Sequence, residues 1–323
     1  MKQLRSILAA CILGSATMTF MTSCQGEKQV IIYSNADDEA IAAMGQALDK
    51  AGYKDKYMFT TFSTSELGGK VIAEGKNIEA DMLTLSSYYL DSAQSANKMF
   101  LPLTFAMEPL KPVNPCFGPI TGQEGAIFIN TKVIEDRGIA VPKSLKDLAK
   151  PEYKGLISIP NIKSSSTAWL MVQALVNAYG EEETRQILKA MIDNAGPHLE
   201  NSGSAPLKKL RAGEVAIAFG LRQQAVADKK KGLPIDYVDP TEGTFSLMEA
   251  VAIPDKGDNT NPETMKMAEI MIREGRKELI KTYPVPLFHG EQAVSDAKSP
   301  HQKTFPQPLT VELLKKHQSL MDN

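Results

Sequence analysis

Short apolar runs alternate along the chain with segments whose apolar residues recur every three or four positions. The runs in the N-terminal third are 29–34, 57–62 and 80–86, and the helical patterns between them are 37–53, 65–75 and 87–98. A short apolar run bounded by polar residues predicts a buried strand, and the longer spacing predicts a helix. Alternating strands and helices favour parallel pairing, so we expect an α/β fold.

The same alternation continues through the middle of the chain with less regular spacing. The expected strands are 125–131, 156–161, 215–220 and 245–254, the last returning to the first unit. The expected helices are 165–180, 181–195, 204–214 and 221–232, with a short helix and a turn at 144–155 and a mostly helical C-terminal part at 262–280 and 309–321. The helix at 65–75 has Ser65 as one possible N-cap.

Three of the expected strands end in small polar residues and pass almost at once into a helix. They read "YSNADD", "LSSYYL" and "IPNIKSSSTA", and the last contains four consecutive hydroxyls, Ser164 to Thr167. Ligands of open α/β sheets bind outside the carboxyl ends of the strands, where the first amides of a helix have no partners and attract anions. One serine could be a helix cap with the rest in a loop. Four hydroxyls exceed what one cap needs, which favours an anion site.

The first 23 residues differ from the rest of the chain. Lys2 and Arg5 precede an interrupted apolar stretch, 7–20, and small residues follow before Cys24. This order is typical of a secretory signal peptide, and the stretch is too short for a membrane span. Because the small residues end on Cys24, we expect residues 1–23 to be a bacterial lipoprotein signal and Cys24 to become the lipidated N-terminus.

Composition and charge narrow the class of protein. The chain has 323 residues, of which 43% are hydrophobic and 23% charged, and its net charge of −2 argues against a nucleic-acid partner. Removal of the signal and lipidation of Cys24 leave Cys116 as the one free cysteine, so we expect no disulfide and no cysteine-based metal site. The four histidines lack metal-ligand spacing. We therefore predict no metal and no cofactor.

Three stretches carry a resemblance to a known family. They are "EGAIFINTKVIEDRGIAVPKSLKDLAKPEYKGLISIPNIKSSSTAWLMVQAL", "NSGSAPLKKLRAGEVAIAFG" and "IEADMLTLSS". Their order and spacing resemble the periplasmic solute-binding proteins of ABC transporters in the ferric iron, thiamine, polyamine and phosphonate group. The similarity covers about 29–290.

This resemblance implies a two-lobed type II periplasmic binding protein fold, in which each lobe is a mostly parallel sheet flanked by helices. The first lobe would comprise 24–118 plus 245–323 and the second lobe 119–244, with crossings near 117–126 and 238–246. A small molecule would bind in the cleft between the lobes. The resemblance further implies a monomer, in the periplasm or at the outer surface and anchored by the lipid, with an ABC permease and an ATPase on separate chains.

The ligand is the least determined part of the sequence-based prediction. Ferric-binding members of the family place adjacent tyrosines where this chain has Leu221 and Arg222. Arg222 would repel a metal cation but could form a fork on a phosphate or phosphonate. Segment 35–40 and Glu242 would suit an ammonium on the same ligand. These features favour an organophosphonate or a phosphorylated sugar, with ferric iron second and a cationic amine such as thiamine or a polyamine third.

The candidate ligand-binding residues share a polar side chain, or a close backbone approach, near a strand end or a helix start. They are Ser34, Asn35, Ser63, Thr64, Ser65, Ser86, Ser87, Tyr88, Ser164, Ser165, Ser166, Thr167, Ser202, Gly203, Arg222 and Glu242. Tyr89 is expected to pack inside the protein, as is Trp169, which is the single tryptophan.

A secreted α/β hydrolase is the alternative from a different class. The chain contains no G-x-S-x-G nucleophile elbow. We therefore predict a binding protein and not an enzyme, and a test for ester or phosphate turnover separates the two.

Overall fold

The structure is a computed structural model that describes residues 29–292 and 299–322. The predicted signal segment 1–23 and Cys24 lie outside the described residues, so their assignment stays a prediction. Within the described ranges, no helix combines the length and the apolar character needed to cross a membrane.

The strands form one continuous sheet. They are β1 Val30–Ser34, β2 Tyr57–Thr61, β3 Met82–Ser86, β4 Gly118–Asn130, β5 Ile157–Pro160, β6 Leu199–Glu200, β7 Ile217–Leu221, β8 Ile235–Val238 and β9 Ser246–Ala252. Their order is β2-β1-β3-β9-β4-β7-β5-β6, with β8 paired to β4. The predicted parallel pairing is confirmed for β1 with β2 and β3, and for β5 with β6 and β7. Strands β4 and β9 are antiparallel to their neighbours.

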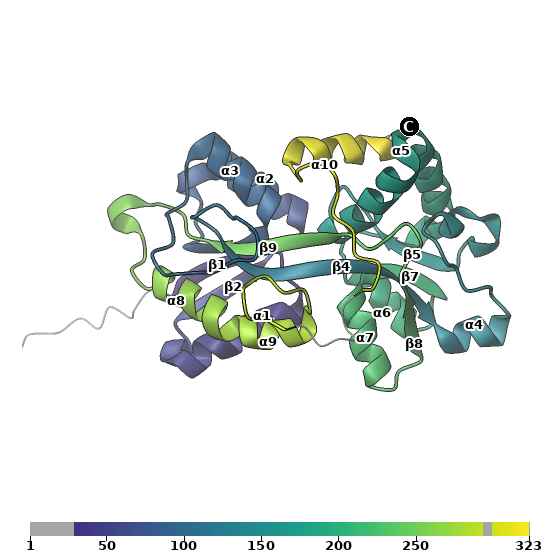
Figure 1. The fold of residues 1–323 in the computed structure, drawn as a ribbon, viewed down its shortest axis with the longest axis horizontal. Coiled ribbons are helices and arrows are strands. Elements are labelled where there is room, and N and C mark those ends of the chain that lie inside the picture. Colours follow the sequence, from purple (N-terminus) through teal and green to yellow (C-terminus); the bar gives the residue numbers. More distant parts are fainter. Residues whose placement is uncertain (1–28, 293–298, 323) are drawn as a thin grey trace, which may run out of the picture.

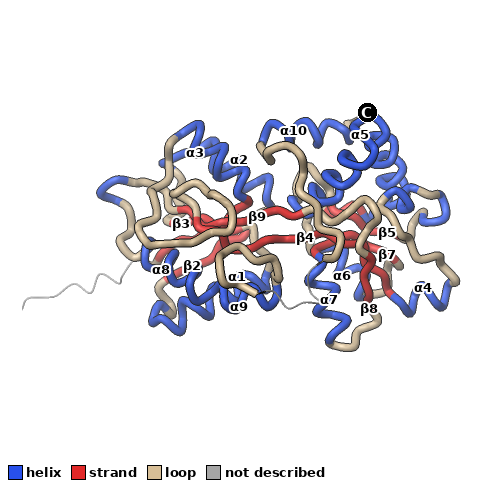
Figure 2. The backbone as a smooth tube through the Cα atoms, in the orientation of Figure 1, coloured by secondary structure: helices blue, strands red, loops and turns tan. Residues whose placement is uncertain are grey.

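The helices occupy both faces of this sheet (Figure 2). They are α1 Asp38–Leu48, α2 Thr64–Glu74, α3 Ser87–Asn97, α4 Thr131–Arg137, α5 Ser166–Ala195, α6 Ala205–Arg211, α7 Arg222–Lys230, α8 Thr264–Ile270, α9 Arg276–Thr282 and α10 Val311–Gln318. The two helices predicted at 165–180 and 181–195 correspond to α5, which changes direction at Gly180, where φ is 74° and ψ is 174°. The short helix and turn predicted at 144–155 are two short 3-10 helices, Lys146–Ala149 and Pro151–Tyr153.

Strand β4 connects the two ends of the molecule. Its first half, from Gly118 to Glu124, pairs with β9, and its second half, from Gly125 to Ile129, pairs with β7. In Figure 1, β1–β3 with α1–α3, α8 and α9 lie at one end, and β5–β8 with α4–α7 lie at the other. All thirteen residues of β4 are buried. The sequence predicted only its second half, because "GPITGQEG" lacks an apolar run.

The C-terminal segment reaches across both groups of elements. Helix α10 contacts α3 and also α5, although residues 245–323 were predicted to belong to the first lobe. The indole Nε1 of Trp169 donates a hydrogen bond of 2.8 Å to Nδ1 of His317. The ring of Tyr88 lies edge-on to Trp169, with centroids 4.8 Å apart. Trp169 is fully buried, as expected, and it joins α3, α5 and α10.

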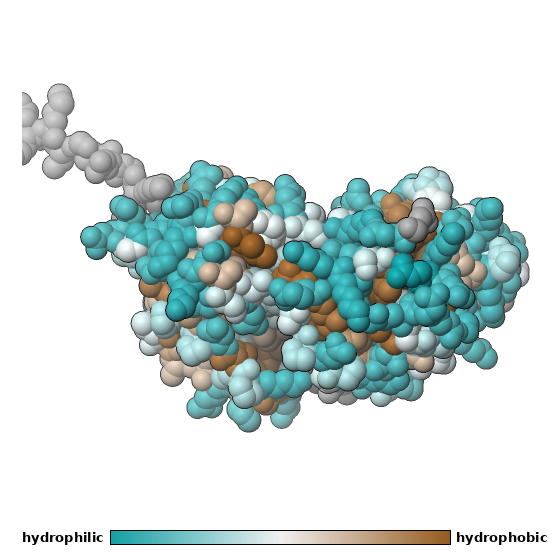
Figure 3. All heavy atoms as spheres, turned by 90° about the horizontal axis from the view of Figure 1, so that it is seen from above, coloured by the Kyte–Doolittle hydropathy of each residue, from teal (hydrophilic) through white to brown (hydrophobic). Residues whose placement is uncertain are grey.

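The outer surface is mostly hydrophilic on the face seen in Figure 3, with small apolar areas near the middle of the molecule. The large apolar side chains that are exposed on the described residues are widely separated along the chain. They are Met58, Leu110, Val141 and Leu233. The polar cavity between the two ends of the molecule is therefore the feature that most clearly points to a ligand.

Candidate functional site

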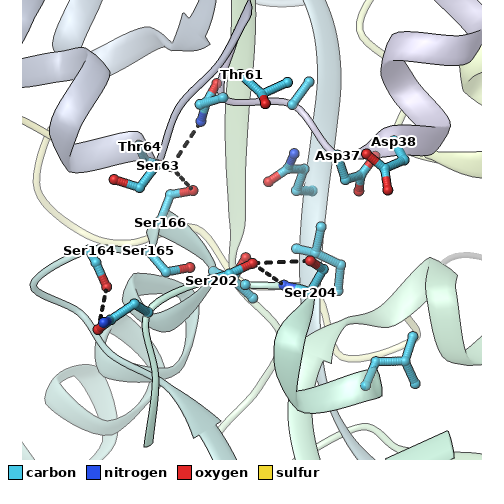
Figure 4. Close-up of a pocket in the computed structure, with 18 of the residues that line it drawn as sticks. Asp37, Asp38, Thr61, Ser63, Thr64, Ser164, Ser165, Ser166, Ser202 and Ser204 are labelled. Carbon is cyan, nitrogen blue, oxygen red and sulfur yellow. Dashed lines mark hydrogen bonds between the residues drawn. The ribbon is translucent and has the colours of Figure 1, made fainter. Parts of the chain in front are cut away.

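A cavity of about 450 Å³ lies at the carboxyl ends of β1, β5 and β7, between the two groups of elements (Figure 4). Nine of the predicted ligand-binding residues line it: Asn35, Ser63, Thr64, Ser164, Ser165, Ser166, Thr167, Ser202 and Gly203. The strand-end pattern in the sequence therefore located this cavity correctly. Whether these residues bind the ligand stays a prediction.

The first turn of α5 presents buried hydroxyls to the cavity. Ser165 is the N-cap residue, yet its side chain accepts no capping hydrogen bond from the helix. Ser165, Ser166 and Thr167 are only 6%, 6% and 4% exposed. The first turn contains no acidic residue. The positive end of the α5 dipole is therefore not offset by a carboxylate of its own, which is the arrangement that favours a bound anion.

Helix α2 begins directly across the cavity from α5. Its N-cap is Ser63, whose side chain accepts from the Glu66 amide, so the suggestion of Ser65 as the cap is wrong. The hydroxyls of Thr64 and Ser166 are 3.1 Å apart, and the Ser65 amide donates to the Ser164 carbonyl at 3.4 Å. These contacts join the two sides of the cavity.

The loop before α6 packs tightly against the hydroxyls of α5. A Cβ added to Gly203 would lie 2.2 Å from Oγ1 of Thr167 and 3.0 Å from Oγ of Ser165. Neighbouring Ser202 and Ser204 have their hydroxyls 3.1 Å apart, and Figure 4 shows both at the edge of the cavity. Only glycine leaves room for this approach.

We expect Gly203→Ala to lower the free energy of unfolding by about 1–3 kcal/mol, because the added methyl group overpacks the start of α5. The control is Gly69→Ala in α2, where a Cβ would meet nothing within 4 Å. That change should raise stability by about 0.5–1 kcal/mol, since alanine is the better helix former. Urea titration measures both, and a Gly203→Ala variant as stable as the wild type would contradict the packing described.

Charged residues divide the cavity into two sides. The carboxylates of Asp37, Asp38, Glu39, Glu66 and Glu249 come from α1, α2 and β9. The cations, Lys208 and Arg211, come from α6. Arg211 is held by a bidentate ion pair with Asp228, at 2.6 and 2.8 Å. Because Asp228 offsets the charge of Arg211, the positive character of the α5 and α6 side comes from Lys208 and the N-terminus of α5, and the carboxylates make the side of α1, α2 and β9 negative.

Two of the carboxylates are held in surroundings that favour protonation. Burial raises the pKa of Glu249 to about 7, and the charge of Asp37 adds to this. Burial also raises the pKa of Asp37, which caps α1 and accepts a hydrogen bond from the hydroxyl of Tyr283. Sequence reasoning missed Glu249; the signal was a single carboxylate inside the apolar run "LMEAVAI".

Other predicted residues lie near the cavity without lining it. These are Ser34, Ser65, Ser86, Ser87 and Tyr88. The Ser34 hydroxyl is buried and accepts from the Thr84 hydroxyl at 2.6 Å and from the Ala36 amide at 3.0 Å. Tyr88 points into the core, where it packs on Trp169 and Tyr89. Tight polar turns after a strand therefore account for several of the serines.

Arg222 and Glu242 also lie outside the cavity lining, and each has partners within the protein. Arg222 forms a bidentate ion pair with Asp239, at 2.7 and 3.1 Å, and stacks 4.5 Å above the ring of Tyr237. Glu242 accepts from the amides of Leu145 and Lys146, both at 3.0 Å. These contacts explain the burial of both side chains, and neither is among the ligand-binding groups that we propose below.

Histidine, cysteine and carboxylate side chains do not gather into a group of three or more that could hold a metal ion anywhere in the two described ranges. Glu249 and Asp37 line the cavity, but their protein contacts are hydrogen bonds to neutral side chains or amides. The site is therefore built from hydroxyls, helix amides and carboxylates.

Comparison with known proteins gives the same picture of the fold. Residues 88–308 match the family described as "Bacterial extracellular solute-binding protein". The chain is 30% identical to the Fe(3+)-binding periplasmic protein of Serratia marcescens over 64% of this chain and 61% of that one. It is 22% identical to the spermidine/putrescine-binding periplasmic protein of Escherichia coli over 80% of this chain and 78% of that one.

A solved structure with a similar fold is the periplasmic binding protein AfuA from Actinobacillus pleuropneumoniae with exogenous fructose-6-phosphate bound. It superposes with a TM-score of 0.70 at 19% identity, over 92% of this chain and 97% of that one. At this identity the likeness establishes the fold alone.

Proposed function

The chain belongs to the bacterial extracellular solute-binding protein family, and from this premise we propose that it captures a small solute with an anionic head group for an ABC importer. It has the type II periplasmic binding protein fold, and its relatives are periplasmic binding proteins rather than enzymes. The family implies a permease and an ATPase as partners. An organophosphonate or a phosphorylated sugar is the solute class that the cavity favours.

The N-terminus of α5 is the observation that carries this proposal. Its dipole has no acidic residue in the first turn, and its N-cap hydroxyl is not used for capping. Three buried hydroxyls line the cavity at the start of this helix, where the first amides have no partner within the helix, and Lys208 lines the same cavity with a positive charge. A polyamine would place an ammonium against this positive helix end, which is unfavourable. Ferric iron has no cluster of histidine, cysteine or carboxylate ligands among the described residues.

We further propose that the two lobes close around the solute, as hinge-joined domains do. The contacts between Thr64 and Ser166, and between Gln224 and Asp37, lie on opposite sides of the cavity and would break on opening. Closure would bury the solute between the α5 side and the α1 side.

A panel experiment tests the proposed function. Native mass spectrometry of freshly purified protein weighs any bound solute, and thermal melting then ranks 2-aminoethylphosphonate, fructose 6-phosphate, putrescine, thiamine and ferric citrate. We expect the phosphorus compounds to raise the melting temperature without being hydrolysed. Stabilisation by putrescine or iron alone, or turnover of an ester or phosphate, would overturn the proposal.

Lipid anchoring gives a separate prediction. If Cys24 is lipidated, the full chain fractionates with membranes, and Cys24→Ala is released into the soluble periplasmic fraction. Western blotting of the two fractions measures this. A Cys24→Ala variant that still sediments with membranes would contradict the anchor while leaving the solute-binding proposal untouched.

A further inference from the structure

The negative side of the cavity contains a buried carboxylate whose protein partners are neutral. Glu249 is 3% exposed and lines the cavity from β9. It accepts from Nδ2 of Asn35 at 2.8 Å and from Oγ1 of Thr121 at 3.2 Å and is also hydrogen-bonded by the side chain of Gln123, and the described residues supply it no ion pair. Burial of a carboxylate without a counter-charge is costly. A cation arriving with the ligand would remove that cost.

A second acceptor, on a side chain in contact with Asp37, is also without a partner. Gln224 is 6% exposed and lines the cavity, and its Oε1 makes no hydrogen bond. Its Nε2 lies 3.5 Å from Oδ2 of Asp37, so the nitrogen faces the carboxylate and Oε1 is the free acceptor. A buried acceptor without a donor costs about 1–3 kcal/mol, so a ligand that donates there gains affinity.

The anion position and this acceptor group are close together. Three hydrogen bonds connect Oγ of Ser166 to Oε1 of Glu249: 3.1 Å from Ser166 to Thr64, 3.0 Å from Thr64 to Asn35, and 2.8 Å from Asn35 to Glu249. Figure 4 shows Thr64 and Ser166 meeting at the side of the cavity. A molecule with only a short chain between its two ends can reach from the helix to the carboxylate.

We propose that the natural ligand is a short zwitterion, with an ammonium held by Glu249, Asp37 and Oε1 of Gln224 and with its phosphonate or phosphate at the start of α5. This inference rests on the proposed function and narrows it to aminoalkyl phosphonates or phosphates, in preference to phosphorylated sugars. An ammonium has three donors and a full charge, so it satisfies all three acceptors at once. A sugar hydroxyl has one donor and no charge.

The protonation state of Glu249 gives a second, independent test of ammonium binding. Burial raises the pKa of Glu249 to about 7, so the unliganded side chain carries a proton more readily at neutral pH than an exposed glutamate does. The groups facing it are Asp37, Tyr88 and Tyr283, together with the neutral side chains of Asn35, Thr121 and Gln123. An ammonium favours the carboxylate, so binding of the amine should release protons at pH 7.

The test uses two probes that differ only at the amine, 2-aminoethylphosphonate and 2-hydroxyethylphosphonate. Calorimetry at pH 7 should show the wild type binding the amine at least about 10-fold more tightly, since hydrogen bonds to charged groups are the stronger ones. Glu249→Gln keeps the size and one acceptor of the side chain but removes the charge. It should weaken the amine about 10- to 100-fold and change the hydroxyl probe less than about 3-fold.

A second variant and a second measurement keep the test valid if Glu249→Gln fails to fold. Gln224→Met removes the free acceptor without adding charge, and it should reduce the preference for the amine while leaving the hydroxyl probe bound. Calorimetry in buffers of different ionisation enthalpy measures the protons released on binding. The wild type should release more protons with the amine probe than with the hydroxyl probe, and this difference should be absent in Glu249→Gln.

The outcomes separate the two levels of the proposal. Equal binding of both probes by the wild type, with Glu249→Gln unchanged, overturns the ammonium site and leaves the anion site standing. Binding of neither probe and no binding of fructose 6-phosphate, with melting curves showing folded protein, overturns the proposed function and the ammonium site together. Tight binding of fructose 6-phosphate in preference to both probes also overturns the zwitterion.

Discussion

Replacing Ser165 and Ser166 together by alanine is expected to lower the affinity for 2-aminoethylphosphonate about a hundredfold or more. Each hydroxyl that bonds a charged oxygen contributes about 1.5–3 kcal/mol, and every 1.4 kcal/mol corresponds to a factor of ten in the dissociation constant. Both side chains are buried at the cavity, and the Ser165 side chain does not cap α5. The Ser166 hydroxyl also meets Thr64 across the cavity, so its loss weakens closure as well.

A capping residue far from the cavity is the control for this double variant. The Thr310 side chain accepts a hydrogen bond from the Leu313 amide at the start of α10. Thr310→Ala should cost about 1 kcal/mol of stability and leave affinity unchanged. Calorimetry and urea titration on both variants give the comparison. If the double serine variant behaves like Thr310→Ala, with lost stability and intact affinity, the serines are a cap and a loop.

Trp169→Ala is expected to lower the free energy of unfolding by about 3–5 kcal/mol. The side chain is fully buried, packs against Tyr88 of α3 and donates to His317 of α10. Its removal leaves a cavity where three helices meet and leaves the His317 acceptor without its donor. Chemical denaturation followed by circular dichroism measures the effect, since the variant lacks the single tryptophan of the chain.

Trp169→Phe separates the two contributions of that side chain. Phenylalanine keeps an aromatic ring against Tyr88 but has no N–H for His317, so a smaller loss of about 1–3 kcal/mol is expected. A Trp169→Ala variant that loses less than about 1 kcal/mol would mean that α10 is not anchored through this residue.

The strand and helix pattern predicted the fold well because local spacing determines it. Strands such as β1 and β3 are apolar runs with polar ends, and the structure places the end of β1 at the cavity, as expected, whereas the end of β3 does not line it. The first half of β4 was missed, because "GPITGQEG" is buried by its neighbours β9 and α9 and not by an apolar pattern of its own. Strand β9 lies antiparallel between β3 and β4, and this pairing also depends on residues that are distant in the sequence.

The sequence predicted those site residues whose place follows from the end of a strand or the start of a helix. It failed for residues whose role depends on partners that are distant in the sequence. Ser165 and Thr167 follow from a strand end and a helix start. Arg222 looked free in the sequence, but its partner Asp239 lies seventeen residues further along and meets it only through the pairing of α7 with β8. Glu249 looked like a core strand residue, and only its proximity to Asn35 and Asp37 identifies it as part of the cavity.

The central claim is that an anionic group is held at the start of α5, with the opposite end of the ligand at Glu249. A crystal structure of the protein with 2-aminoethylphosphonate tests it most directly. The account predicts phosphonate oxygens about 2.7–3.2 Å from the amides of Ser166 and Thr167, with the ammonium at the same range from Glu249. A ligand in the reverse orientation, or one bound outside the cavity, would contradict it.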